Sequence, residues 1–252
     1  MPRLNVRYDS AMRTFAAGTP KLDSPHKGLL LDRFIAPKEA HSKTNYRGDL
    51  LAVTSYSSQS PLYRKAFTRW EETVREKGLC TVRASVMNRL ALGLGNESVL
   101  ENGCRLHRTY GVPVIPGSSV KGALRAGLLD IDDYRQYETG LFGTPDRAGA
   151  VEVFDAWWDP EKSTGSGLAL DVVTVHHQDY YSGKDAPKES ESPVPVHFLT
   201  IKGTFLFAFR VDGDVSWSDF VRELAFYVFD RKGLGAKKSS GYGRFRREGK
   251  KV

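Results

Sequence analysis

Residues 115–125 read Ile-Pro-Gly-Ser-Ser-Val-Lys-Gly-Ala-Leu-Arg, and this stretch decides how the 252-residue chain folds. The Pro-Gly pair is typical of a turn, and Ser118 or Ser119 can cap a helix that begins directly after it. Apolar residues then recur at helical spacing at Val120, Ala123, Leu124, Leu128 and Leu129. The sequence therefore predicts a turn followed by an amphipathic helix.

The segments around this helix alternate between helical and strand patterns. Apolar spacings of three to five predict a helix from Pro61 to Lys77, and alternation predicts a strand from Thr81 to Leu94. We also predict strands over 151–157, 168–175, 200–211 and 241–245, a short helix over 132–140, and a helix over 216–231 opened by a capping box at Ser216. This order fits an α+β fold, a βαββαβ ferredoxin-like sheet with long insertions and with helices on one face.

Composition divides the chain into two parts. Residues 1–60 are rich in Ser, Lys, Arg and Pro, broken by an apolar stretch over residues 29–34, so we predict an extended arm with one docking segment. Residues 61–252 are expected to form a single domain. Within it, residues 176–195 are too long and polar for an ordinary connection, which indicates a functional excursion at about 176–199.

The charge balance favours a polyanionic partner. The formal net charge is +7. Cationic side chains that bind the phosphates of a nucleic acid release its condensed counterions, and this release favours binding. Cys80 and Cys104 belong to no CxxC or Cys/His quartet, so neither a disulfide framework nor a structural metal is indicated. No stretch reaches the ~20 apolar residues of a membrane helix. We expect a soluble, cytoplasmic protein without cofactor, metal or membrane contact.

The strongest local signal is the run Gly-Leu-Gly-Ala-Lys-Lys-Ser-Ser-Gly-Tyr-Gly-Arg over residues 233–244. Glycines let a backbone approach a ligand closely, cations add charge, and hydroxyls donate to phosphate oxygens. The candidate RNA contacts in this run are Gly235, Lys237, Lys238, Ser239, Ser240, Gly241 and Arg244. It is no Walker A loop, because GxxxxGK[ST] is missing and a strand follows. The alternative is a mobile basic loop in solvent.

A second candidate anion site lies at the start of the helix after residue 117. Ser118, Ser119 and the free backbone amides meet at the helix N-terminus, and Lys121 and Arg125 follow one turn apart on one face. The alternative is ordinary capping with a solvated charged face. Two such segments in one basic chain favour binding of a phosphate backbone.

The excursion adds aromatic candidates, whereas catalytic patterns are missing. Tyr180 and Tyr181 can stack on splayed bases or can anchor their own loop. His176 and His177 are adjacent on a predicted strand and point to opposite faces, which disfavours a shared metal. No Ser/His/Asp order and no HExxH pattern is present. We therefore expect no catalytic residues.

Both phosphate-binding candidates also carry a family resemblance. Residues 115–125 resemble the helix-opening motif of RAMP proteins, and residues 233–244 resemble their C-terminal glycine-rich loop. Residues 93–101, 106–113 and 171–184 narrow the resemblance to the family of sixth Cmr subunits of type III-B CRISPR effector complexes. The likeness covers roughly Gly93 to the C-terminus.

The resemblance implies an RRM-related fold and a noncatalytic subunit in antiviral defence. Such a subunit holds the 3′ part of the guide RNA and its target duplex near the end of the backbone filament. The implied partners are guide RNA (crRNA), target RNA, the backbone RAMP subunit and the first Cmr subunit. Cleavage is attributed to an Asp of the backbone subunit; Asp32 is its nearest analogue by position, but no motif surrounds it. The excursion with Tyr180, Tyr181 and Lys184 corresponds by position to a thumb-like hairpin over the duplex.

Two other functions remain open at this point. A RAMP endoribonuclease that processes precursor guide RNA would use the same glycine-rich loop, with His107, His176 or His177 as general acid or base. A protein-only assembly cap would use the basic surface for acidic protein neighbours. Metal-independent cleavage of a repeat RNA distinguishes the first of these from an RNA-holding subunit.

Overall fold

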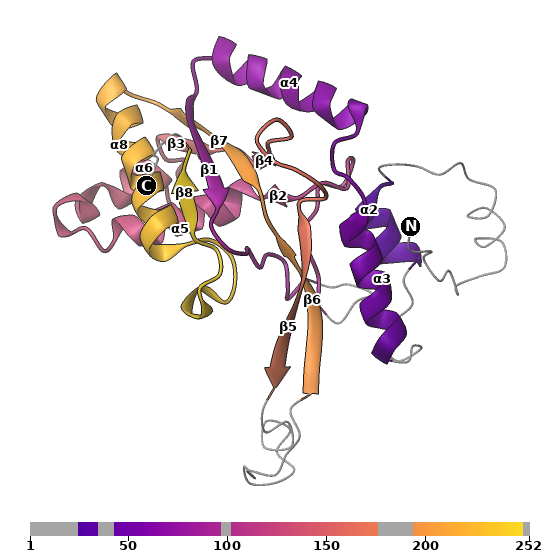
Figure 1. Cartoon of the computed structure of the whole chain (residues 1–252). Coiled ribbons are helices and arrows are strands. Elements are labelled where there is room, and N and C mark those ends of the chain that lie inside the picture. The colour runs from indigo at the N-terminus through magenta and orange to yellow at the C-terminus, as the bar shows by residue number, and fades with distance from the viewer. Residues whose placement is uncertain (1–24, 35–42, 97–101, 176–193, 249–252) are drawn as a thin grey trace, which may run out of the picture.

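The computed structural model of the chain describes residues 25–34, 43–96, 102–175 and 194–248 (Figure 1). Its helical elements are α2 (Lys27–Leu29), η1 (Leu30–Phe34), α3 (Lys43–Ser55), α4 (Pro61–Glu76), α5 (Gly117–Leu128), η3 (Asp132–Tyr137), α6 (Glu138–Phe142), α8 (Val215–Tyr227), η4 (Val228–Lys232) and η5 (Lys238–Ser240). Its strands are β1 (Cys80–Val86), β2 (Val114–Ile115), β3 (Val151–Val153), β4 (Ala156–Trp158), β5 (Leu168–Val175), β6 (Val194–Ile201), β7 (Thr204–Val211) and β8 (Phe245–Arg247). Across these described ranges, no helix combines the length and the apolar content that crossing a bilayer requires.

An antiparallel sheet lies at the centre of the molecule, with the strand order β2-β4-β7-β1-β8. β3 also pairs with β7, next to β4 in the chain, so β3 and β4 act as one interrupted strand. Apart from the edge strand β2, the sheet has four strands, which we number by their order in the chain. Across the sheet from β8, they lie in the order fourth (β8), first (β1), third (β7) and second (β3 with β4). Helix α5 follows the first of them in the chain, and α8 follows the third. This is the βαββαβ order of a ferredoxin-like sheet, and it confirms the predicted fold class.

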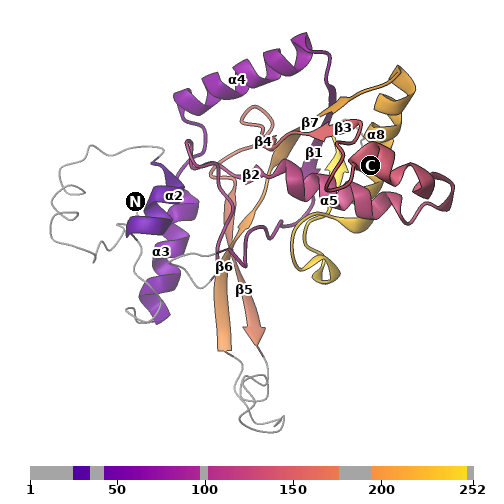
Figure 2. The ribbon, with the colours of Figure 1, turned by 180° about the vertical axis from the view of Figure 1, so that it is seen from behind.

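The two faces of the sheet are covered by different helices. The Cys80 thiol at the start of β1 donates to the Ser218 carbonyl of α8, 3.3 Å away. The side chain of Arg83, which points the other way on the same strand, pairs with Glu71 of α4. Figures 1 and 2 show α4 on one side of the sheet and α5 and α8 on the other. We predicted helices on one face, and α4 adds a helix to the second.

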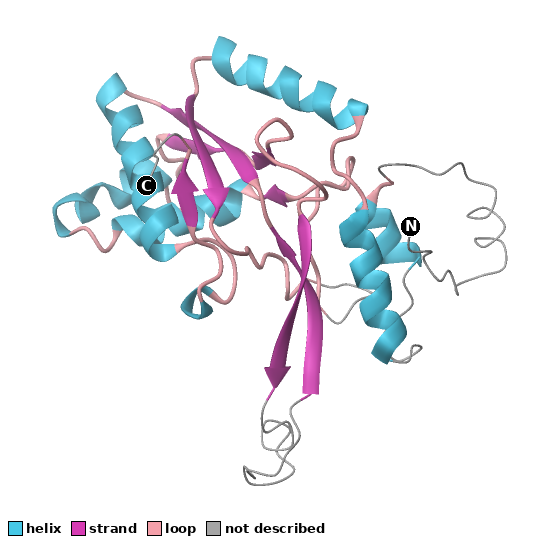
Figure 3. Ribbon diagram, in the orientation of Figure 1, coloured by secondary structure: helices cyan, strands magenta, loops and turns pink. Residues whose placement is uncertain are grey.

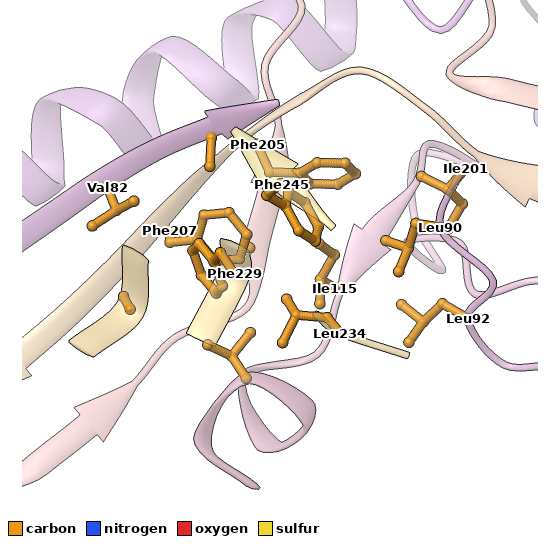
Figure 4. Close-up of a cluster of buried hydrophobic side chains, with 14 of the residues drawn as sticks. Val82, Leu90, Leu92, Ile115, Ile201, Phe205, Phe207, Phe229, Leu234 and Phe245 are labelled. Atoms are coloured by element: carbon orange, nitrogen blue, oxygen red, sulfur yellow. The ribbon is translucent and has the colours of Figure 1, made fainter. Parts of the chain in front are cut away.

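Aromatic rings fill the core between the sheet and α8 (Figure 4). Phe207 lies 4.4 Å from the ring of Phe229 and 5.8 Å from that of Phe245, and Phe205 is fully buried beside them. Every residue from 204 to 209 is buried. Because both faces of β7 are covered, this strand is a continuous apolar run and does not alternate with polar residues.

Helix α4 docks through aromatic side chains, which explains its sequence pattern. Tyr63 stacks on Trp157 at a ring distance of 5.9 Å, and Trp70 stacks on the same ring at 6.1 Å. The Tyr63 hydroxyl donates to the carbonyl of Trp158 over 2.6 Å. The predicted helix over residues 61–77 is confirmed, with Ser60 as its N-cap.

The expected extended arm contains helical structure in its described part. Residues 43–55 form α3, where Leu50 and Val53 are buried in the same core as the sheet. Leu31, from the expected docking segment, is also 4% exposed and belongs to this core. The helical period of α3 was missed because its buried face includes Asp49, while Leu51 is 52% exposed. Polar and apolar residues therefore form no clean stripe.

Several predicted strands are shorter or split. The strand expected over 81–94 ends at Val86, and the one expected over 200–211 divides into β6 and β7 at Gly203, whose φ is +110°. β6 begins at Val194, inside the expected excursion. The strand expected over 151–157 divides into β3 and β4. Strand patterns do not reveal such breaks, because the apolar alternation continues through them.

The bounds of two elements in the C-terminal part of the chain, α8 and β8, also differ from prediction. α8 begins at Val215, with Asp214 as its N-cap: the Asp214 carboxylate accepts from the amide of Ser216 over 2.9 Å. The predicted cap at Ser216 was wrong by two positions. The final strand spans 245–247 and not 241–245, because Gly241 and Gly243 have positive φ angles of +86° and +76° that no strand adopts.

Lys27 is buried where the N-terminal segment meets the domain. Its side chain is 1% exposed, and its ammonium group donates to the Ser58 hydroxyl over 2.8 Å and to the Ser57 carbonyl over 3.0 Å. Burial disfavours the charged form and lowers the pKa of Lys27 from 10.5 to about 7. The amine is therefore largely neutral in the folded protein at mildly alkaline pH.

This burial predicts that the protein becomes more stable as pH rises from about 7 toward 10.5. In that window the unfolded chain binds a proton at Lys27 that the folded chain does not, so the unfolding free energy increases by up to ~1.4 kcal/mol per pH unit. Below pH 7 both states bind the proton, and the slope disappears. Urea unfolding at several pH values should show this slope in the parent and in the exposed control Lys65→Met, but not in Lys27→Met. Equal slopes in all three proteins would contradict the assignment.

Candidate nucleic-acid interface

The glycine-rich segment, residues 233–244, folds into a closed loop that we call the basic loop. The amide of Leu234 donates to the carbonyl of Gly243 over 2.8 Å and closes the base of the loop. The amides of Ala236 and Gly243 donate to carbonyls of residues 89–91 over 2.8 and 2.7 Å. The loop is therefore fixed by backbone hydrogen bonds to the segment that follows β1.

The glycines of the loop mostly serve its own packing. A Cβ on Gly243 would lie 1.9 Å from the Leu234 carbonyl oxygen, and one on Gly235 would lie 2.3 Å from that of Ala91. Gly241 has open space around it, although its φ of +86° is in the left-handed region. Gly235 and Gly243 therefore leave room for the protein's own backbone, whereas Gly241 faces open space and remains a candidate for close approach of a ligand.

The tip of the loop presents cations and hydroxyls. Lys237 has a φ of +56°, in the left-handed region that residues other than glycine rarely adopt. Its ammonium group lies 5.7 Å from the ring centroid of Phe198 in β6, within cation–π range. Lys238, Ser239 and Ser240 form the one-turn helix η5 and are exposed. The strained Lys237 thus connects a fixed base to an accessible tip.

Tyr242 fastens the basic loop to the β5–β6 hairpin, which projects from the rest of the molecule in Figure 3. Its hydroxyl donates to the carboxylate of Asp171 in β5 over 2.9 Å, and its ring lies 6.2 Å from that of Phe198. Partial burial, together with the hydrogen bond and the negative charge of Asp171, raises the pKa of Tyr242. The loop and the base of the hairpin therefore form one rigid unit.

Tyr242→Phe is expected to lower the unfolding free energy by about 1 kcal/mol, because a partly buried hydrogen bond is lost while the ring remains. Hydrogen exchange at the Gly243 amide should also become faster, since this amide anchors the loop on residue 89. Tyr227→Phe is the control, because no hydrogen bond links its exposed hydroxyl to another described residue. Equal effects of both substitutions on exchange at Gly243 would show that the Asp171 contact does not hold the loop.

Positive charge accumulates along the basic loop and the strand after it. Residues 233–247 contain five cations and no carboxylate: Lys237, Lys238, Arg244, Arg246 and Arg247. Three of the five are engaged with the chain, including Lys237, whose ammonium group lies near the Phe198 ring. Arg244 donates to the Asp230 carbonyl over 2.7 Å, and Arg247 lies 4.2 Å from the Phe226 ring and 3.5 Å from the Glu223 carboxylate. Lys238 forms no ion pair with a described residue, which leaves it available to an external anion.

Arg89 joins this surface, although sequence reasoning missed it. Its carbonyl accepts the Gly243 amide over 2.7 Å, and its positive charge offsets part of the rise in the pKa of Tyr242. The signal in the sequence was weak: a polar Asn88-Arg89 pair inside the strand predicted over 81–94, beyond the point where β1 ends at Val86. Only the pairing of residues 89–91 with the loop brings Arg89 to this site.

The start of α5 differs from the predicted anion site. Pro116 occupies the N-cap position, and neither Ser118 nor Ser119 caps the helix; both are exposed. The Asp155 carboxylate accepts from the amide of Gly117 over 2.8 Å, so a carboxylate of the chain itself already occupies part of the helix N-terminus. An acidic neighbour weakens attraction of a phosphate at this point.

The two predicted cations of α5 differ in whether they form an ion pair. Arg125 forms an ion pair with Glu138 of α6, whereas Lys121 pairs with no carboxylate among the described residues. Figures 1 and 2 both show the basic loop below α5. The two predicted segments therefore lie on one side of the molecule, but no hydrogen bond or ion pair between described residues joins them.

His107, considered above as a general acid or base, is packed among aromatic rings. It lies 4.7 Å from Tyr110 and 5.3 Å from Trp157, and its Nδ1 accepts the Thr109 amide over 3.1 Å. Partial burial lowers the pKa of His107. This arrangement is typical of a structural histidine. Asp32 is exposed on η1.

Five predicted residues lie outside the described part of the chain. They are His176, His177, Tyr180, Tyr181 and Lys184. The described strands β5 and β6 pair along their full lengths, from Leu168 with Ile201 to Val175 with Val194, and they lead into that segment. The hairpin thus connects the excursion to the basic loop through Asp171 and Phe198.

Comparisons with known proteins agree with the fold. The family model described as "RAMP superfamily" matches residues 83–246. A curated relative from Pyrococcus furiosus, "CRISPR system Cmr subunit Cmr6", is 27% identical over 73% of this chain and 72% of its own length. A relative from Saccharolobus solfataricus, "CRISPR system CMR subunit Cmr6", is 28% identical over 66% of this chain and 55% of its own length.

One solved structure adds a match in three dimensions. A chain of the type III-B Cmr-beta complex bound to cognate target RNA superimposes with a TM-score of 0.62 at 21% identity. The match covers 84% of this chain and 77% of that one. At this level of identity the likeness establishes the fold alone.

Proposed function

The chain belongs to the RAMP superfamily, and on that premise we propose that it is a noncatalytic, RNA-binding structural subunit of a type III-B CRISPR Cmr effector complex. Two curated relatives, both named as a Cmr subunit, support the complex. The observation that carries RNA binding is the basic loop: five cations without a carboxylate over residues 233–247, held on a rigid base.

The geometry suits contacts to a phosphate backbone. Lys238 and the hydroxyls of Ser239 and Ser240 project from the tip, while Lys237 and Arg89 lie nearer its base. These groups bind phosphate and ribose oxygens and read no base edges, which is what a subunit needs if it must hold any guide sequence. The preformed loop also reduces the entropy lost on binding.

Within the complex, the proposed position is near the end of the backbone filament, at the 3′ part of the guide RNA. The β5–β6 hairpin carries the excursion toward the duplex of guide and target RNA. The hydrogen bond between Tyr242 and Asp171 fixes the position of the hairpin relative to the basic loop. The proposed protein neighbours are the backbone RAMP subunit and the first Cmr subunit.

We infer that the chain itself does not cleave RNA. His107 is held by stacking and by a backbone amide, and no described carboxylate forms a hydrogen bond or ion pair with it, although the charge of Asp155 acts on its ring. The Cys104 thiol is also a poor nucleophile, because burial raises its pKa to about 12. The competing processing endoribonuclease would need its acid and base close to the basic loop.

Reconstitution of the effector complex tests the proposal. Complexes assembled with this chain should crosslink it to the 3′ part of the guide RNA, and the chain alone should leave a repeat RNA intact in EDTA. Metal-independent cleavage at the repeat would favour the processing enzyme. Assembly without any crosslink, together with shortened filaments when the chain is left out, would favour the protein-only cap.

A further inference from the structure

A cluster of aromatic side chains lies where η3 meets the start of α8, and we call it the aromatic patch. Its rings are Tyr134, Tyr137, Trp217 and Phe220. Tyr134 lies 4.7 Å from Phe220, Tyr137 lies 5.4 Å from Trp217, and Trp217 lies 5.7 Å from Phe220. The four rings therefore hold one another in a fixed arrangement.

The patch is only half covered by the protein. Trp217 and Phe220 pack against the core, but Tyr134 and Tyr137 are 40% and 41% exposed. Val215, two residues before Trp217 at the start of α8, is 76% exposed, the highest value among the large apolar side chains of the described residues. Exposed apolar side chains gathered around fixed rings mark interaction sites, and aromatic rings are among the side chains that contribute most to protein interfaces.

The charge around the patch is opposite to that of the basic loop. Residues 132–137 and 212–222 contain five aspartates and two arginines. Both arginines are already paired, Arg135 with Asp132 and Arg222 with Asp219. Asp133 and Asp214 are exposed and have no ion-pair partner among the described residues. This acidic rim repels phosphates, so the patch does not suit RNA, although the chain as a whole is basic.

We propose that the aromatic patch is the surface through which this chain docks a neighbouring protein subunit of the effector complex, one with an apolar centre and a basic rim. The inference rests on the proposed function and adds to it a specific contact surface and the chemistry of its partner. Charge complementarity selects the partner: the acidic rim attracts cationic side chains, while the rings supply the desolvated centre. RNA and protein are thus bound at separate surfaces.

Two double variants of the full chain test this in the reconstituted complex. Tyr137→Ser/Val215→Ser removes exposed apolar surface, and Asp133→Lys/Asp212→Lys reverses exposed rim charge without touching a helix cap. Each should lower incorporation of the chain into complexes at least 10-fold, as measured by native mass spectrometry. Leu62→Ser/Leu51→Ser, at exposed apolar positions on α4 and α3, is the matched control and should incorporate like the parent.

Guide-RNA binding by the isolated full-length variants, measured with the guide RNA itself, should equal that of the parent. Normal incorporation of both patch variants would overturn the docking surface while leaving the proposed function intact. Weaker guide-RNA binding by the isolated patch variants would overturn it in favour of an RNA surface. If even the parent chain fails to enter the complex, the proposed function itself is wrong, so the two failures are distinguishable.

Discussion

Lys237→Ala/Lys238→Ala is expected to reduce crosslinking to the 3′ part of the guide RNA in the reconstituted complex by about 10-fold at low salt. Lys238 lies at the exposed tip of the basic loop and Lys237 directly before it, and no carboxylate competes for them within residues 233–247. Each lost phosphate contact should also reduce the slope of log affinity against log salt by about 0.7 to 1. A salt series on the variant and the parent measures this slope.

The control must remove the same charge elsewhere. Lys65→Ala/Lys77→Ala removes two exposed lysines of α4 and its C-cap, on the other side of the sheet from α5 and α8. It changes the net charge equally but should leave the salt slope and the 3′ crosslink unchanged. If both double variants behave alike, only the overall charge matters. If the loop variant assembles and binds like the parent, the loop is structural, and the protein-only cap becomes the better explanation.

Gly243→Ala is expected to lower the unfolding free energy by about 2 to 4 kcal/mol, a large effect for one methyl group. The new Cβ would lie 1.9 Å from the Leu234 carbonyl oxygen, and a backbone atom cannot move aside without opening the loop. The φ of +76° adds strain of its own. Urea unfolding measures the stability, and hydrogen exchange at Ala236 reports whether the loop has left residue 91.

Gly241→Ala separates the two causes. This glycine has a similar φ of +86° but no atom within 4 Å of its Cβ position, so alanine should cost only about 1 kcal/mol. RNA crosslinking should survive in Gly241→Ala and decline in Gly243→Ala. Equal destabilisation by both substitutions would mean that the loop is not packed as described, and that backbone conformation alone accounts for the loss.

The parts of the fold that were predicted correctly depend on local signals. α4 and α5 were found because their apolar residues repeat at helical spacing and because Pro-Gly marks the turn before α5. α3 was missed because a buried Asp49 and an exposed Leu51 interrupt its apolar face. The order of the strands followed from the element order. Where each strand stops depends on its partners, and these are distant in sequence.

The candidate site shows the same division. The cations and hydroxyls of the basic loop could be predicted because they are consecutive in the sequence. The groups that hold the loop in place, Asp171, Phe198 and Arg89, are brought to it by strand pairing and were not identified. Ser118 and Ser119 were expected to cap α5. Asp155, 38 residues from Gly117, accepts the helix amide instead, and a local pattern cannot reveal such a contact.

The edges of the central sheet bear on how the chain behaves at high concentration. The outermost strands are very short: β2 has two residues and β8 has three. β8 also carries Arg246 and Arg247, both exposed. Short, charged edges offer few free backbone groups to a strand of another molecule. The sheet is thereby protected against edge-to-edge aggregation, including during the interval between synthesis and assembly.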